Sequence, residues 1–149
     1  MDDVISPLHF LRSAGMVVAT VIVQSLAQIA LSRAIEMLPP PRGHRNLDGY
    51  AVLHILVAIG ILMLGMVAEI TLWGLLYFSW GELGRFGNAI YFSLASFTTV
   101  GATELSLTPP HRMAGALESA VGMLMFGWST ALLFEVIQGT RGRRDPSHR

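Results

Sequence analysis

The amino-acid sequence predicts an all-α membrane protein with three transmembrane helices and a short re-entrant helix between the second and the third. Hydrophobic residues make up 52% of the 149-residue chain, charged residues make up only 13%, and the mean hydropathy is +0.54. Ordinary soluble domains carry about twice that share of charged residues. The hydrophobic residues also fall into three long runs, with a short apolar stretch between the last two. We therefore expect the lipid bilayer to be the partner of most of the chain.

The composition excludes several classes of function. The basic residues are all Arg and balance ten Asp and Glu residues, so no basic face for nucleic acid is predicted. The chain has no Cys, which excludes disulfides, thiol catalysis and thiolate metal sites. Its five His residues show no metal-ligand spacing, and no nucleophile has a base nearby in the sequence. We predict that the protein is not an enzyme, needs no cofactor and has no small-molecule substrate.

Residues 13–31 form the first apolar run. At about 1.5 Å per residue a helix of this length reaches about 28 Å, close to the thickness of the hydrocarbon core. We expect Gln24 and Gln28 within it to bond to a neighbouring helix. The chain starts with acidic residues, where a signal peptide has a positive region, so this run is expected to stay in the mature protein. Residues 1–49 then comprise this extra helix and a short polar connector.

Residues 50–77 and 113–137 form the second and third apolar runs, each long enough to span a membrane. Trp73, Tyr77 and Trp80 at the end of the second run are typical of an interfacial belt. Between the two runs, residues 89–98 make only about three helical turns. A segment this short must leave the membrane on the side where it entered, and its irregular part must be surrounded by protein or a water-filled cavity.

The arginines predict the orientation of the chain. Placing the C-terminal tail, residues 139–149, in the cytoplasm gives seven Arg inside and three outside, in agreement with the positive-inside rule. The connector between the first two spans is then cytoplasmic, and the re-entrant segment lies outside. The inside set is Arg33, Arg42, Arg45, Arg141, Arg143, Arg144 and Arg149; the outside set is Arg12, Arg85 and Arg112.

The stretch from Tyr91 to Thr103 reads YFSLASFTTVGAT, so a short helix runs into two hydroxyl residues, Val100 and a glycine. The sequence TTVG at this place between two spans, with Gly122 and Gly127 in the third span, resembles the two-helix pore module of the potassium channel superfamily. In particular it is similar to small prokaryotic ion channel proteins with a TVGYGD filter. The resemblance covers residues 50–138 and implies a channel for monovalent cations in a prokaryotic cytoplasmic membrane, with potassium or sodium as the permeant ion.

The resemblance also implies where ions bind. Backbone carbonyls of Thr99, Val100, Gly101 and Ala102, with the Thr99 hydroxyl, would replace the hydration shell of a cation. One chain brings only one such loop, and a ring of carbonyls needs several, so the functional form is expected to be an oligomer; by resemblance it is a homotetramer. A non-conducting membrane subunit that keeps the channel fold is the alternative.

The sequence departs from the filter pattern after Gly101, because TVGYGD becomes TVGATE. Ala102 replaces the Tyr that holds the filter at a fixed width in the family. Thr103 replaces the second Gly, where a left-handed backbone would cost a β-branched residue about 1–2 kcal/mol. We expect Thr103 to adopt another conformation and the selectivity for potassium to be weaker than with the full motif.

Further residues are predicted to support the filter or to line the pore. Thr98, Thr103, Glu104, Glu69 and Glu118 are assigned to filter support, although an interfacial position would also explain Glu69 and Glu118. Glu82 and Glu104 are expected to ring the outer mouth, and His111 could make that mouth sensitive to pH. Residues four apart on the third span form a stripe of mixed polarity, which we assign to the cavity and gate, with ordinary helix packing as the alternative. The stripe comprises Gly122, Phe126, Thr130, Phe134 and Gln138.

Overall fold

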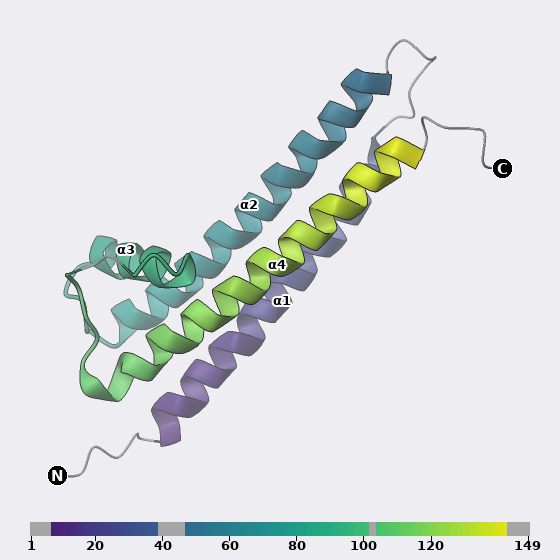
Figure 1. The fold of residues 1–149 in the computed structure, drawn as a ribbon. Coiled ribbons are helices and arrows are strands. Elements are labelled where there is room, and N and C mark those ends of the chain that lie inside the picture. The colour runs from purple at the N-terminus through teal and green to yellow at the C-terminus, as the bar shows by residue number, and fades with distance from the viewer. Residues whose placement is uncertain (1–6, 39–46, 102–103, 143–149) are drawn as a thin grey trace.

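The computed structural model describes residues 7–38, 47–101 and 104–142, and all the regular elements within them are helices (Figure 1). Three helices are long and apolar enough to cross a membrane, over Leu11–Met37, Gly49–Ser79 and Pro109–Thr140. These findings confirm the all-α class and the three candidate spans. The elements in chain order are α1 (Pro7–Met37), α2 (Leu47–Ser79), α3 (Phe86–Phe97), the 3-10 turn η2 (Pro109–His111) and α4 (Arg112–Gly142).

The three long helices lie side by side, and α3 packs against one end of them (Figure 1). Helices α1, α2 and α4 all contact one another, whereas α3 contacts α2 and α4. The helices extend beyond the predicted apolar runs because the flanking polar residues continue the helical turns. In a bilayer this arrangement satisfies every backbone group of the spans within its own helix.

Buried polar side chains of α1 attach it to the other two long helices. Thr20 and Gln24, one turn apart, are fully buried. The indole Nε1 of Trp73 donates to Thr20 Oγ1 at 3.0 Å, and the Gln24 amide donates to Ser129 Oγ at 2.9 Å. Trp128 Nε1 donates to Gln28 Oε1 at 3.2 Å, which confirms that both glutamines bond to a neighbouring helix. Hydrogen bonds of this kind hold helices together where water is excluded.

The aromatic residues at the end of α2 do not form the predicted interfacial belt. Trp73 and Tyr77 have no exposed surface and belong to a core between α2, α3 and α4. The interpretation was wrong for these two residues because neighbouring helices cover them: Trp73 bonds to Thr20 of α1, and Tyr77 bonds to Glu118 of α4. The other buried members of this core are Leu83, Ala89, Phe92, Phe97, Leu107, Ala114, Val121 and Met125.

A tight turn places α3 back against α2. Gly81 and Gly84 have φ angles of 72° and 66°, a left-handed conformation that glycine adopts without steric cost. Leu83 between them is buried, and its carbonyl accepts a hydrogen bond from the side-chain amide of Asn88 at 3.2 Å. The turn therefore fixes the direction in which α3 leaves the end of α2.

Candidate functional site

Helix α3 runs back along α2, in the opposite direction to it. Near the start of α3, Ile90 packs so closely on Gly74 that a Cβ at Gly74 would lie 2.5 Å from Ile90 Cδ1. Three residues later, Ser93 Oγ lies 2.8 Å from the carbonyl oxygen of Ile70, one turn further back on α2. As α3 advances, its partners on α2 therefore move away from the end of α2 and toward the middle of the bundle.

The contacts with α4 show the same progression. A Cβ at Gly115 would lie 3.4 Å from the ring of Phe92, and Ser119 Oγ donates to the Ser96 carbonyl at 2.8 Å. Deeper still, a Cβ at Gly122 would lie 2.1 Å from the carbonyl oxygen of Phe97. From Gly115 to Gly122 the axis of α4 advances about 10 Å. The backbone of the last turn of α3 therefore packs directly on the backbone of α4, about three turns after the start of α4.

The segment after α3, residues 98–101, which we call the TTVG segment, folds back on the end of that helix. The N–H groups of Thr98, Thr99 and Gly101 donate to the carbonyls of Leu94, Ser96 and Ala95 at 3.1, 2.9 and 3.0 Å. The Thr98 hydroxyl also donates to Leu94 O at 2.7 Å. These bonds use the last carbonyls of α3, which would otherwise be orphaned at a helix terminus.

The carbonyls of the TTVG segment itself remain available. No hydrogen bond to the carbonyl of Thr99, Val100 or Gly101 is formed by the residues that the structure describes. These three residues are exposed, and Val100 keeps 67% of its surface accessible in the single chain. The site thus has an exposed apolar side chain and three successive carbonyls without a hydrogen-bond partner among the described residues.

Two residues of the TTVG segment have a left-handed backbone conformation, and the residue between them does not. Thr99 has φ 59° and Gly101 has φ 61°, while Val100 between them does not have a positive φ. A left-handed backbone costs a non-glycine residue about 1–2 kcal/mol, and Thr is β-branched. Such strain is concentrated at functional sites. Thr103, which was expected to avoid a left-handed conformation, and Ala102 lie outside the described residues. The left-handed residue is Thr99, for which no such conformation was predicted.

Three helices meet at the carboxyl group of Glu118, just behind α3. Its Oε2 accepts a hydrogen bond from the Tyr77 hydroxyl at 2.6 Å, and its Oε1 lies 2.5 Å from Ser93 Oγ. All three side chains are fully buried. Ser93 also approaches Ile70 O, but a hydroxyl carries one proton and donates to one acceptor at a time. The group joins α2, α3 and α4 through side chains that have no contact with water.

Glu69 is equally buried but is placed differently. It has no exposed surface, and neither carboxyl oxygen has a hydrogen-bond partner in the described part of the chain. It lies on α2 between Gly65, which packs on Ala27 of α1, and Trp73, which bonds to Thr20 of α1. The structure therefore places Glu69 on the face of α2 toward α1 and does not bond it to Ser93 or Ser96.

A second hydrogen-bonded cluster connects the α2–α3 turn to the start of α4. Glu82 accepts from the Thr108 N–H at 2.7 Å, from the Thr108 hydroxyl, and from His111 Nδ1 at 2.6 Å. Trp80 stacks on the His111 ring with the centroids 4.2 Å apart. Burial alone would raise the pKa of Glu82, but the hydrogen bonds from Thr108 and His111 outweigh it and hold that pKa below its ordinary value.

The predicted stripe on α4 divides into two parts. Gly122 is buried against the backbone of Phe97. The Phe126 ring lies against the Phe97 ring, with the centroids 5.9 Å apart. Phe126 keeps 37% of its surface exposed, and Thr130, Phe134 and Gln138 are also exposed in the single chain. Glu104, beyond the TTVG segment, is exposed as well.

Sequence reasoning missed two contributors to this site. Tyr77 was assigned to the membrane interface, and Ser119 was not singled out. For Tyr77, the available signal was its spacing of four from Trp73, which puts both side chains on one face of the helix. Ser119 carried no signal of its own. No group of three or more His, Asp or Glu side chains that could hold a metal ion occurs among the described residues.

Comparison with known families agrees with this geometry. A family model described as "Ion channel" matches residues 50–139, which contain α3, the TTVG segment and most of α2 and α4. No curated protein and no solved structure matches the chain. The match covers more than half of the chain and confirms the resemblance drawn from TTVG, so the protein belongs to the ion channel family, of the potassium channel-like kind with a two-helix pore module.

Proposed function

We propose that this protein is a tetrameric membrane channel that passes monovalent cations through a pore lined by the TTVG segments. The observation that carries the proposal is that the carbonyls of Thr99, Val100 and Gly101, at the end of a short helix, have no hydrogen-bond partner among the described residues. Carbonyl oxygens without partners are the ligands that a dehydrated cation needs. The partial negative charge at the C-terminus of α3 adds to the attraction for a cation.

We infer that α3 is a re-entrant pore helix. Its 12 residues reach about 18 Å, too short to cross the hydrocarbon core. Its partners on α2 and α4 lie progressively deeper along both spans, from Gly115 to Gly122 on α4. The non-helical TTVG segment is then held inside the bilayer by protein on one side and faces the pore on the other, as backbone at that depth requires.

The proposal of a tetramer rests on surfaces that the single chain leaves uncovered. Tyr91 and Leu94 of α3 are 51% and 44% exposed, and Val100 is exposed beside them. A hollow of about 590 Å³ lies next to Thr99 and Gly101, between the TTVG segment and the start of α4. Neighbouring subunits around a central axis would cover the α3 face and complete the ring of carbonyls.

Residues around the TTVG segment take supporting roles in this proposal. Thr98 and the group Glu118, Ser93 and Tyr77 fix the end of α3, and Glu104 adds negative charge at the outer mouth. Glu69 sits one layer further out, between α2 and α1. The stripe from Phe126 to Gln138 lines the cavity and the inner gate, while Gly122 holds α4 against α3.

The selectivity for potassium is proposed to be weak, because Ala102 and Thr103 replace the residues that fix filter width in the family. The protein is proposed to lie in a prokaryotic cytoplasmic membrane with its C-terminus inside. Flux from liposomes that contain purified protein tests the function. Potassium and sodium flux of similar size, with a higher potassium preference after Ala102→Tyr and Thr103→Gly are combined, is the expected result. A tetramer without flux supports a non-conducting subunit instead, and firm exclusion of sodium contradicts weak selectivity.

The absence of Cys makes the pore lining directly testable. Thr130→Cys and Leu124→Cys introduce a thiol at two exposed positions of α4, of which only Thr130 is on the proposed cavity stripe. A small charged thiol reagent is expected to block flux through Thr130→Cys and to leave Leu124→Cys unaffected. Equal block of both variants would show that the stripe is not the cavity wall.

A further inference from the structure

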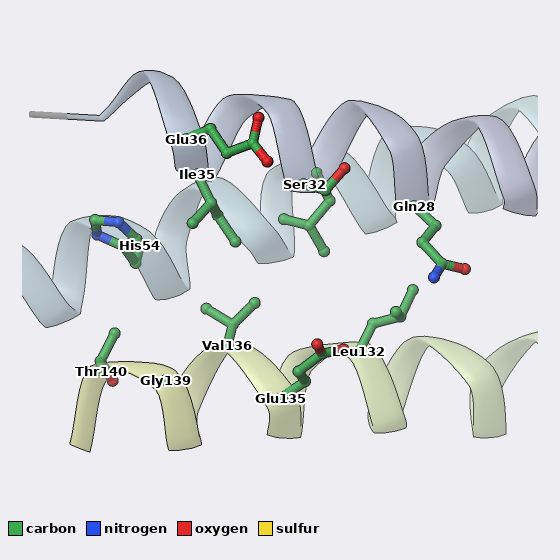
Figure 2. A pocket seen from close by; sticks show the side chains of 11 residues that line it. Gln28, Ser32, Ile35, Glu36, His54, Leu132, Glu135, Val136, Gly139 and Thr140 are labelled. Carbon is green, nitrogen blue, oxygen red and sulfur yellow. The ribbon is translucent and has the colours of Figure 1, made fainter. Parts of the chain in front are cut away.

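A cavity of about 370 Å³ lies between α1, α2 and α4 (Figure 2). It is near the end of α1, the start of α2 and the end of α4, at the end of the bundle away from α3 (Figure 1). Its walls come from Gln28 to Glu36 of α1, His54 of α2 and Leu132 to Thr140 of α4. The whole α1 wall lies outside the family match, which begins at residue 50. The cavity is therefore built only where the extra helix meets the pore module, and it has the size of a small-molecule site.

The polar groups at this cavity accept hydrogen bonds and offer few donors. The Ser32 hydroxyl already donates to Ile29 O at 2.9 Å, and the Thr140 hydroxyl donates to Ile137 O at 2.8 Å. The amide of Gln28 is the remaining donor, since its oxygen accepts from Trp128. The two carboxylates, Glu36 and Glu135, can only accept when ionised.

His54 adds another acceptor. It is 2% exposed, and its Nδ1 lies 2.8 Å from the carbonyl oxygen of Tyr50. A carbonyl can only accept, so Nδ1 carries the hydrogen, and in the neutral ring Nε2 is then an acceptor. This buried Nε2 has no hydrogen-bond partner among the described residues. A buried polar atom without a partner is costly, and a ligand with a donor would remove that cost.

Charge and shape select the class of ligand. Among the residues that the structure describes, no Arg lines the cavity and none forms an ion pair with Glu36 or Glu135. Leu31, Leu132 and Val136 are buried apolar residues of the cavity lining. Leu132 and Val136 lie on α4 next to Glu135 (Figure 2). A ligand that fits has a cationic group with N–H donors at one end and an alkyl chain at the other.

We propose that this cavity is a binding site for an amphiphilic primary amine, whose ammonium group pairs with Glu135 and whose alkyl chain packs on Leu31, Leu132 and Val136. The ligand bridges the extra helix α1 and the pore-module helix α4. If α4 carries the gate, as the proposed function states, the bound amine restrains the cytoplasmic end of that helix. Binding itself does not depend on whether the pore conducts.

Calorimetric titration of the full-length protein in lipid nanodiscs with octylamine tests the site, after subtraction of the heat from empty nanodiscs. Octanol, octanoate and octyltrimethylammonium serve as probes of equal chain length that lack the charge, reverse it, or lack the N–H donors. We expect saturable binding of octylamine and at least tenfold weaker binding of the other three. Octanol or octanoate binding as tightly as octylamine, or no heat beyond that of empty nanodiscs, would overturn the proposal.

Two variants locate the binding. Glu135→Gln keeps the shape of the side chain and is expected to weaken octylamine binding about tenfold or more, whereas Glu104→Gln, an exposed acid at the other end, leaves it unchanged. Gly139→Leu adds a side chain at a lining position where a Cβ meets nothing within 4 Å, and it should abolish binding. Unchanged binding in both Glu135→Gln and Gly139→Leu would refute the site, whatever the flux measurements give.

Discussion

The contact between Gly122 of α4 and the end of α3 gives the sharpest test of how the site is held. A Cβ added at Gly122 would lie 2.1 Å from the carbonyl oxygen of Phe97, 2.9 Å from its carbon and 3.1 Å from its Cα. An ordinary contact between carbon and oxygen is about 3.3 Å, so Gly122→Ala must separate the two backbones by about 1 Å. Phe97 directly precedes the TTVG segment, and this segment would move with it.

The expected cost follows from two opposing terms. Overpacking of a core costs about 1–3 kcal/mol, and the upper end applies because the neighbour is backbone and cannot rotate away. Alanine in place of glycine in a helix contributes about 1 kcal/mol of stabilisation. The net destabilisation is therefore about 2 kcal/mol, or about 30-fold in the unfolding equilibrium.

Gly127→Ala is the matched control, because Gly127 lies on the same helix and a Cβ there meets nothing within 4 Å. It should be as stable as the parent protein or more so. Unfolding in mixed micelles with increasing SDS measures both changes, and liposome flux reports on the TTVG segment. The reasoning is refuted if Gly122→Ala matches the parent in stability and flux. Equal loss of flux in both variants would instead indicate that α4 must bend at its glycines.

Three further predictions concern the groups around α3. Glu118→Gln should change stability by less than about 1 kcal/mol, because a Gln oxygen still accepts from Tyr77 and its amide can donate to Ser93. Glu118→Ala instead leaves the Tyr77 hydroxyl unpaired and should cost about 2–4 kcal/mol in the same SDS unfolding. Thr99→Gly removes the left-handed strain at φ 59°, so stability should not fall while flux decreases with loss of the hydroxyl; a less stable variant would argue against the strain. Hydrogen bonds from Thr108 and His111 hold the pKa of Glu82 below its ordinary value of 4.5. The stability that the ionised Glu82 contributes is therefore complete above pH 4.5 and is lost as the pH falls below it. Thermal unfolding from pH 6 to pH 3 should show this loss in the parent and a smaller one in Glu82→Gln.

Much of the fold follows from the sequence alone because a bilayer imposes strong rules on a chain. Backbone groups in lipid must form their hydrogen bonds within their own segment, so long apolar runs become helices. Each run that is long enough to cross the hydrocarbon core predicts one span. The short run before TTVG could not span, and its place between two spans indicated a pore module, which the family match confirms. Apolar composition also predicted that polar residues such as Gln24 would find partners on another helix.

Only the tertiary structure decided which face of each helix is covered. The pattern of hydrophobic residues cannot decide it, since lipid and a protein core are both apolar. For this reason Trp73 and Tyr77 were assigned to the interface and are instead buried, and Glu69 is placed toward α1 while Glu118 joins α3. The left-handed Thr99, the close approach at Gly122 and the cavity at His54 likewise depend on residues far apart in the chain. Local sequence determined that a short helix ends in the TTVG segment between two spans, and the packing of α2 and α4 against α3 determined how that segment is held.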